Sequence, residues 1–258
     1  MKDNEYTSFE MMVTVAAREI KDRELVLAGI GLPVLASNLA QKTHAPNSLL
    51  LFEAGGLLKG GCKILPLAVD DFGTYVLSEA TLSMCAVMGA LGRGEVDVTF
   101  LGGGQVDKYG NVNSVGFGDF TQPHTIKLLP GSGGANPMSS LGKRTLIVMP
   151  QEKRKFVEKV AHLTSPGWLW GAGARESVGL PPDRGPTMII SDMGIFRFDE
   201  KTKEAYLDSI VPGATIENIK ANTGWSLKSA SEIRKVDPPT EEELNALREI
   251  DKTHLYYS

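Results

Sequence analysis

Ser48-Leu49-Leu50-Leu51-Phe52-Glu53-Ala54-Gly55-Gly56 is the stretch of sequence from which the fold prediction starts. Its first five residues form a short, mostly apolar run of strand length, which predicts a strand buried on both faces. Because Glu53 and the glycines follow at once, a carboxylate is predicted at the carboxyl end of that strand. Open α/β sheets bind their ligands at this edge. The stretch therefore indicates both a fold class and a candidate site.

Further short apolar runs have the same character, and amphipathic helical patterns lie between several of them. The predicted buried strands are residues 24–29, 97–101, 145–149 and 187–191. Four helices are predicted. The first follows a capping box at Thr7-Ser8-Phe9-Glu10 and reaches Ile20, and the second runs from Leu35 to Gln41 after Pro33. The third covers 77–89 with Met84 and Met88 facing inward, and the fourth extends from a cap at Thr240 to Ile250. This alternation predicts an open, mostly parallel α/β sheet flanked by helices, similar to a Rossmann fold.

The later part of the chain has more strands and fewer helices. Residues 194–199 read as half of a hairpin, so mixed or antiparallel strands are predicted in the C-terminal half. There is no internal repeat, and residues 236–239 only separate the last helix from the rest. We therefore expect a single domain over residues 1–258.

Charge and composition exclude several classes of protein. The 258 residues carry 27 Lys and Arg against 31 Asp and Glu, a formal net charge of −4, so no nucleic-acid partner is expected. Glu152 and Glu158 interrupt the basic run Lys153-Arg154-Lys155, which is interpreted as a solvated face. No apolar stretch reaches the ~18–20 residues of a membrane helix, and Met1–Glu5 does not resemble a signal peptide. We expect a cytoplasmic protein without a membrane partner.

Cysteine and histidine usage does not indicate a metal centre. Cys62 and Cys85 form no C-x-x-C motif, and the four histidines are scattered along the chain. Two reduced thiols and no metal are therefore expected.

Glu53 is the first candidate functional residue. A partly desolvated carboxylate at a strand end can act as a nucleophile or a base, and Gly55 and Gly56 allow another backbone or a substrate to approach closely. The same position also suits a glutamate that only caps the strand or pairs with a cation. Spacing alone does not separate these roles.

Two glycine-rich segments are the second candidate. Gly102-Gly103-Gly104-Gln105 follows a predicted strand, and Gly131-Ser132-Gly133-Gly134-Ala135-Asn136 lies in a predicted loop. Such runs expose backbone N–H groups that can hold an oxyanion, a phosphate or a thioester carbonyl. They can equally be tight turns.

Two other motifs are incomplete. Gly29-Ile30-Gly31, with Glu53 24 residues after Gly29, resembles a dinucleotide-binding fingerprint, but Val34 stands in place of its third glycine. Ser132 lacks the G-x-S-x-G elbow of a serine nucleophile. A nicotinamide cofactor is accordingly a minor alternative.

The ordered set of motifs resembles the beta subunit of family I CoA-transferases, most closely that of glutaconate CoA-transferase, over nearly the whole chain. The motifs are, in order, 52–55, 101–107, 109–113, 131–136, 164–168, 192–196 and 222–225. The resemblance implies a CoA-transferase-like open α/β fold, a separate alpha subunit (a heterodimer assembled as alpha2beta2 or larger), and CoA as a substrate without a permanently bound cofactor.

The resemblance also assigns roles to residues. It implies that Glu53 is the nucleophile of a ping-pong reaction, passing through a mixed anhydride and a glutamyl-CoA thioester. It implies substrate or CoA binding by Gly55, Gly102, Gly103, Gly104, Gln105, Gly131, Ser132, Gly133, Gly134, Ala135 and Asn136. Relatives often carry Asn-Gly or Ser-Gly after the glutamate, whereas Ala54 stands here, so one hydrogen bond near the thioester is expected to be missing.

Two alternatives to a transferase stay open. One is a CoA-thioester hydrolase or C–C bond-cleaving, ring-opening enzyme on the same fold. The other is a structural subunit that supplies pocket walls to a catalytic alpha subunit. The sequence does not identify the acyl group, although a dicarboxylate such as glutaconate fits the resemblance.

Overall fold

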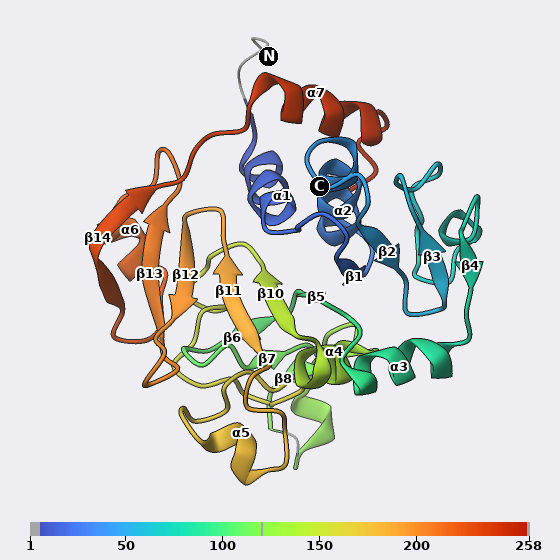
Figure 1. The fold of residues 1–258 in the computed structure, drawn as a ribbon. Coiled ribbons are helices and arrows are strands. Elements are labelled where there is room, and N and C mark those ends of the chain that lie inside the picture. Colours follow the sequence, from blue (N-terminus) through green and yellow to red (C-terminus); the bar gives the residue numbers. More distant parts are fainter. Residues whose placement is uncertain (1–5, 120, 257–258) are drawn as a thin grey trace. The chain divides into compact units, whose positions relative to one another are not determined.

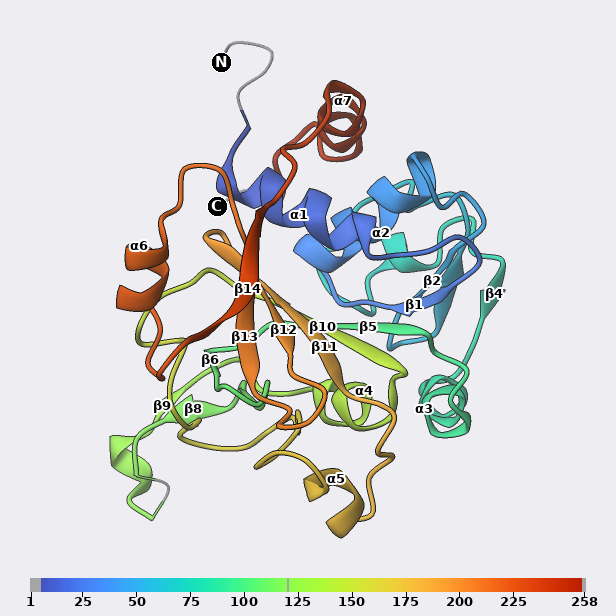
Figure 2. The same cartoon turned by 60° about the vertical axis from the view of Figure 1, so that its left-hand side comes forward.

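The structure, a computed structural model, describes residues 6–119 and 121–256, and its internal packing divides the chain into two units (Figure 1, Figure 2). The first unit is the chain up to Phe100 together with the chain from Pro238 onward, and the second is Leu101–Asp237. The return to the first unit falls inside the 236–239 segment, so the last helix packs with the N-terminal elements.

Three helices pack together in the first unit: α1 (Ser8–Arg18), α2 (Leu32–Lys42) and α7 (Glu241–Ile250) (Figure 1). The predicted capping boxes at Thr7 and Thr240 are both present. Ion pairs Arg18–Glu243 at 2.7 Å and Arg248–Glu10 at 2.8 Å tie α1 to α7. α2 begins before Pro33 rather than after it, because proline in the first helical turn lacks only an N–H that has no helical partner there.

The strands of the first unit lie in the order β5-β1-β2-β3-β4. β1 (Leu25–Leu27) pairs in parallel with β2 (Leu49–Leu51) and with β5 (Val98–Leu101). The chain leaves β1 towards β2 on one side and later returns as β5 on the other. Strand order therefore reverses between β1 and β5, which is where open sheets bind ligands, and β2 ends at the same edge one strand further along.

An antiparallel excursion follows β2. β3 (Gly56–Leu58) pairs with β2 and with β4 (Ala80–Thr81), and a short helical turn η1 (Phe72–Thr74) lies between them. The predicted helix over 77–89 is wrong in its start and its inward face. α3 spans Met84–Arg93 from an N-cap at Ser83, and Met84 is exposed whereas Val87 and Leu91 are buried.

Five strands of the second unit lie in the order β10-β11-β12-β13-β14. They are β10 (Arg144–Val148), β11 (Pro186–Ile190), β12 (Gly194–Phe198), β13 (Ala205–Ile210) and β14 (Lys228–Lys235). β10–β11 and β13–β14 are parallel, and β12 is antiparallel to both of its neighbours. A ring cluster of Phe156, Phe196 and Trp225, with centroids 5.7–6.4 Å apart, is part of the core.

Short elements complete the second unit. The helices are α4 (Ala135–Leu141), α5 (Ala174–Ser177) and α6 (Ile216–Ala221), with a second helical turn η2 (Pro123–Thr125). Two small antiparallel ribbons pair β6 (Gln105–Val106) with β7 (Val112–Asn113), and β8 (Gly116–Phe117) with β9 (Lys127–Leu128).

The predicted fold class is confirmed, including the antiparallel strands in the C-terminal half. The antiparallel pairs β2–β3 and β3–β4 in the first unit were not predicted. Within residues 6–119 and 121–256, no helix is long and apolar enough to span a bilayer.

Candidate functional site

Glu53 lies in a tight turn between β2 and β3. The Phe52 N–H donates to the Gly56 carbonyl, and the Gly55 N–H donates to the Phe52 carbonyl, each at 2.9 Å. Phe52 is fully buried and Glu53 is half-buried. Two backbone hydrogen bonds and a buried aromatic side chain thus fix the turn that carries Glu53 at the carboxyl end of β2, where the sequence predicts this residue.

The two glycines of this turn admit the chain's own backbone. Gly55 has φ +115°, and a Cβ added to it would lie 1.9 Å from the carbonyl oxygen of Leu82. A Cβ on Gly56 would lie 2.0 Å from the carbonyl oxygen of Thr74. The expected close backbone approach is therefore made by the 74–82 segment, and substrate binding by Gly55 stays a prediction.

A tyrosine supports the same turn. The Tyr75 hydroxyl donates to the Ala54 carbonyl at 3.1 Å, and the Leu82 N–H donates to the Gly55 carbonyl at 2.9 Å. Sequence reasoning missed Tyr75 because its partner is a backbone atom 21 residues earlier. Tyr75 lies in the segment between β3 and β4, and that position became apparent only from the pairing of these two strands.

The structure brings parts of the two glycine-rich segments of the second unit together. A cavity of about 420 Å³ is lined by Gly102, Gly103, Gly104, Ser114, Leu129, Pro130, Gly131 and Lys155. Both segments thus share one cavity, whose other walls are largely apolar. Walls of this kind suit an apolar chain.

The glycines that line this cavity differ in their packing and in their backbone hydrogen bonds. A Cβ on Gly103 would lie 2.4 Å from Val112 Cγ1, and one on Gly104 would lie 2.3 Å from Leu129 Cδ1, so these side chains pack closely against both glycines. The Gly104 and Gly131 N–H groups donate to the carbonyls of Asn113 and Ser114 at 2.8 and 3.0 Å. These two amides are therefore engaged within the unit, and both residues contribute cavity wall.

The remaining predicted binding residues belong to the same two glycine-rich segments but are not among the residues that line the cavity. Gln105 lies in β6, and its side-chain oxygen accepts from Asn113 and from the Ala161 N–H. Ser132, Gly133 and Gly134 form the turn before α4, which begins at Ala135, and the Asn136 amide donates to the Thr164 carbonyl at 2.9 Å. Gln105 and Asn136 thus have structural partners, and ligand binding by Gln105 and by residues 132–136 stays a prediction.

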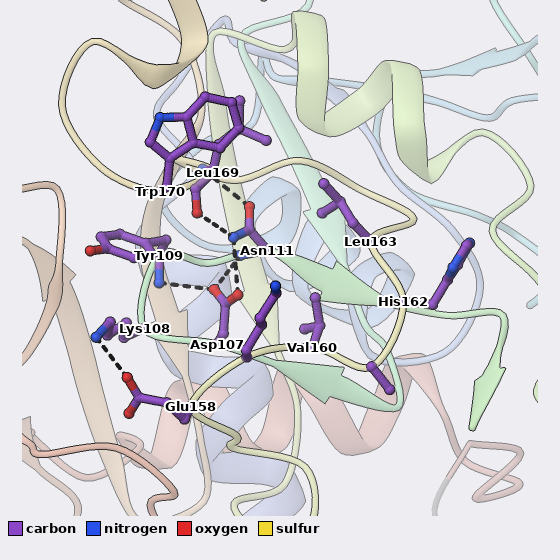
Figure 3. Close-up of a pocket in the computed structure, with 12 residues that line it drawn as sticks. Asp107, Lys108, Tyr109, Asn111, Glu158, Val160, His162, Leu163, Leu169 and Trp170 are labelled. Atoms are coloured by element: carbon purple, nitrogen blue, oxygen red, sulfur yellow. Dashed lines mark hydrogen bonds and ion pairs between the residues drawn. The ribbon is translucent and has the colours of Figure 1, made fainter. Parts of the chain in front are cut away.

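Two of the motifs that carry the family resemblance, 109–113 and 164–168, contact each other, and Asn111 of the first motif is drawn in Figure 3. The Asn111 side-chain oxygen accepts from the N–H groups of Gly167 and Leu169, and its amide donates to the Leu169 carbonyl and to Asp107. A Cβ on Gly167 would lie 2.3 Å from the Tyr109 carbonyl oxygen. Packing and hydrogen bonding therefore join the 109–113 and 164–168 motifs.

A second cavity of about 580 Å³ adjoins these motifs, with Trp170 exposed at its edge (Figure 3). Burial raises the pKa of Asp107, and hydrogen bonds from Asn111 and from backbone N–H groups only partly offset this. Lys108 pairs with Glu158 at 2.7 Å and lies 3.9 Å from Glu204. Two of the charged residues that line this cavity, Lys108 and Glu158, are thus paired with each other, and Lys159 lines it as well.

The minor alternatives receive no further support. Val34, which occupies the third-glycine position of the dinucleotide fingerprint, is fully buried in α2, whereas that glycine serves close helix–strand packing. Across residues 6–119 and 121–256, no three His, Cys, Asp or Glu side chains gather as metal ligands.

Comparisons with known proteins agree with this geometry. Residues 9–222 match the sequence profile of the coenzyme A transferase family. The chain is 37% identical over 249 residues to the B subunit of 3-oxoadipate CoA-transferase from Pseudomonas knackmussii, covering 95% of this chain and 94% of that one. It is 37% identical over 240 residues to the B subunit of glutaconate CoA-transferase from Acidaminococcus fermentans, covering 90% and 89%.

A solved structure agrees as well. The crystal structure of glutaconate coenzyme A-transferase from Acidaminococcus fermentans superposes with a TM-score of 0.91 at 33% identity, covering 99% of this chain and 98% of that one. The profile match, the relatives and the fold lead to one assignment. This chain belongs to the coenzyme A transferase family, as a beta subunit of a family I CoA-transferase.

Proposed function

We propose that this beta subunit, with an alpha subunit, moves CoA between an acyl-CoA and a carboxylic acid through a glutamyl-CoA thioester on Glu53. The observation that carries the proposal is the position of Glu53, half-buried in a tight turn at the carboxyl end of β2. A half-buried carboxylate on a turn with a fixed backbone is partly desolvated, which is a property of an activated nucleophile.

The proposed reaction balances without water. A Glu53 carboxylate oxygen attacks the thioester carbonyl carbon, the C–S bond breaks, and CoA leaves as the thiolate with a mixed anhydride left on the enzyme. The thiolate then attacks the glutamyl carbonyl, releasing the first acid and leaving glutamyl-CoA. An incoming carboxylate runs these steps in reverse, so the acyl bond energy is conserved.

The two glycine-rich segments are the second part of the proposal, as the resemblance implies. We propose that they bind part of the acyl-CoA, since they share a cavity within the second unit, and that their backbone provides walls or donors for oxyanions. Ala54 has no polar side chain, so the turn offers only backbone groups at that position, and Tyr75 already bonds to its carbonyl.

The relatives suggest the substrate class and the assembly. Both are B subunits by name, and 3-oxoadipate and glutaconate are dicarboxylates. We therefore propose a dicarboxylyl-CoA substrate, an alpha-subunit partner in an alpha2beta2 or larger assembly, a single functional beta-subunit domain over 1–258, and a cytoplasmic location. No permanently bound cofactor enters the proposed steps.

The test uses the complex of this chain with its alpha subunit and follows exchange of labelled acid into acyl-CoA. Wild type should show ping-pong kinetics. Glu53→Ala should abolish exchange, and Glu53→Asp should lose on the order of 10²-fold, because it withdraws the carboxylate by about one methylene. Glu249→Asp is the matched control, since Glu249 lies on the outer face of α7 and pairs with Lys42.

Two results would favour the alternatives. Release of free CoA without any acceptor acid indicates a hydrolase or a C–C bond-cleaving enzyme. Full activity of Glu53→Ala, with activity lost when the chain is omitted, indicates a structural subunit.

A further inference from the structure

The cavity between the glycine-rich segments has one charged lining residue, Lys155. The other residues that line it are glycines, Ser114, Leu129 and Pro130. The Lys155 side chain is 24% exposed, and its backbone is fixed from both sides. Its N–H donates to Glu152, and its carbonyl accepts from Val106 in β6, each at 2.7 Å. The backbone of a lysine is thus fixed at the wall of an otherwise uncharged, largely apolar cavity.

The charges around Lys155 do not cancel. The Glu152 carboxylate interacts with both Arg154 and Lys155, at 2.6 Å each. Hydrogen bonds from these two cations lower the pKa of Glu152 to about 2, so it carries one negative charge at neutral pH. Two cations therefore share one anion, and the group keeps a net positive charge beside the cavity.

The larger cavity differs in this respect. Its lining contains two lysines, Lys108 and Lys159, and two acidic residues, Asp107 and Glu158, and Lys108 is paired with Glu158. Its charges offer no comparable excess for an anion. The basic run 153–155, interpreted from the sequence as a solvated face, thus has one member that faces the cavity and two that are exposed.

We infer that Lys155 is a specificity-determining residue whose ammonium binds an anionic oxygen group of the substrate in the cavity formed by Gly102–Gly104 and Gly131. The inference rests on the proposed function, and it deepens it by naming the chemistry recognised. A carboxylate or phosphate oxygen accepts a charge-assisted hydrogen bond from Nζ, which can turn from Glu152 because Arg154 still pairs with that carboxylate. The remaining apolar walls suit the chain that carries the anion.

Two parts of an acyl-CoA carry such a group: the distal carboxylate of a dicarboxylyl chain and the phosphates of CoA. Equilibrium binding to the alpha–beta complex separates them, with glutarate, butyrate and CoA as probes. A Glu53→Gln background prevents turnover, so binding is measured independently of the transferase reaction. The variants are Lys155→Met, the conservative Lys155→Arg, and the matched control Lys153→Met from the exposed end of the same run.

Lys155→Met should weaken binding of the recognised anion roughly 10- to 100-fold, because a charge-assisted hydrogen bond is lost. Lys155→Arg should restore most of it, and Lys153→Met should change it less than about twofold. Weaker binding of glutarate with butyrate and CoA unchanged identifies the distal carboxylate. Weaker binding of CoA with both acids unchanged identifies the phosphates.

Equal binding of all three probes by Lys155→Met and its parent would overturn the inference, as would an equal loss in Lys153→Met and Lys155→Met. Failure of the proposed function has a different signature. If the Lys155 variants change probe binding as predicted but the wild-type complex transfers no CoA, the proposed function fails and the anion site stands.

Discussion

Replacing Gly55 by alanine tests whether the turn that holds Glu53 depends on a close backbone contact. The new Cβ would lie 1.9 Å from the Leu82 carbonyl oxygen, whereas real Cβ atoms essentially never come within 3.0 Å of another heavy atom. One of the two backbones must therefore move by about 1 Å. A displacement of that size from a reactive geometry costs about 10²-fold in rate.

The stability cost of the same change can be separated into two parts. Alanine at φ +115° is strained by about 1–2 kcal/mol, and overpacking adds about 1–3 kcal/mol. Gly60→Ala is the matched control, because Gly60 also has positive φ (+76°) but has no heavy atom within 4 Å of the added Cβ. Only the conformational part, about 1–2 kcal/mol, applies to it.

The assay combines urea denaturation of the alpha–beta complex with kcat/KM for CoA transfer. We expect Gly55→Ala to lose about 2–5 kcal/mol of unfolding free energy and about 10²-fold in kcat/KM, and Gly60→Ala to keep near-normal activity. If the two variants had the same stability and the same activity, the contact between Gly55 and Leu82 would not hold the turn, and this account of its geometry would be wrong.

Three further predictions use the same complex. Tyr75→Phe removes the hydrogen bond to the Ala54 carbonyl and should cost about 0.5–1.5 kcal/mol and a several-fold drop in kcat; no change in either would show that the hydroxyl is dispensable. Arg175 is buried and donates to three backbone carbonyls at 2.7–2.9 Å. Arg175→Met should therefore lower the free energy of unfolding by about 3–5 kcal/mol, and a loss below about 1 kcal/mol in urea titrations would contradict this. Burial raises the pKa of Glu10, but Arg248 and Thr7 outweigh it and the net pKa is lowered. Stability from Glu10 should thus be complete above its unfolded pKa and lost as pH falls through the lower folded value; Glu10→Gln should flatten the acid limb of the stability curve, and an unchanged limb would refute that link.

Much of the fold follows from local patterns. The capping boxes at Thr7 and Thr240 mark α1 and α7, and short apolar runs mark β1, β2, β5, β10 and β11, because buried parallel strands need apolar side chains on both faces. The antiparallel excursion from β3 to β4 could not be predicted in this way. β3 begins with Gly56 and β4 consists of Ala80 and Thr81, so neither is an apolar run like β1 or β2, and contacts of Gly55 and Gly56 with distant backbone hold them.

The start of α3 was missed for a related reason. Residues 77–83 have an apolar pattern close to that of a helix, but Leu77 has φ +57° and β4 occupies part of the segment. Pairing with β3 overrides local propensity there. The helix starts only where Ser83 accepts a hydrogen bond from the Ala86 N–H.

The candidate site was predicted in part. Glu53 lies where the end of a buried strand places it, and both glycine-rich segments contribute to one cavity. The functions of individual glycines could not be read from their spacing, since Gly103 and Gly104 are small in order to pack against Val112 and Leu129. The position of Lys155 at the cavity wall could not be predicted, because a basic run resembles a solvated surface unless the fold places one member beside a cavity.

Direct detection of a covalent intermediate on Glu53 tests the central claim. The alpha–beta complex is mixed with acyl-CoA without an acceptor, treated with borohydride, which reduces a thioester to the alcohol, or with hydroxylamine, which gives a hydroxamate, and the Glu53 peptide is examined by mass spectrometry. We predict that Glu53 alone is modified, and only when acyl-CoA is present. An unmodified Glu53 in a complex that still transfers CoA would contradict the account.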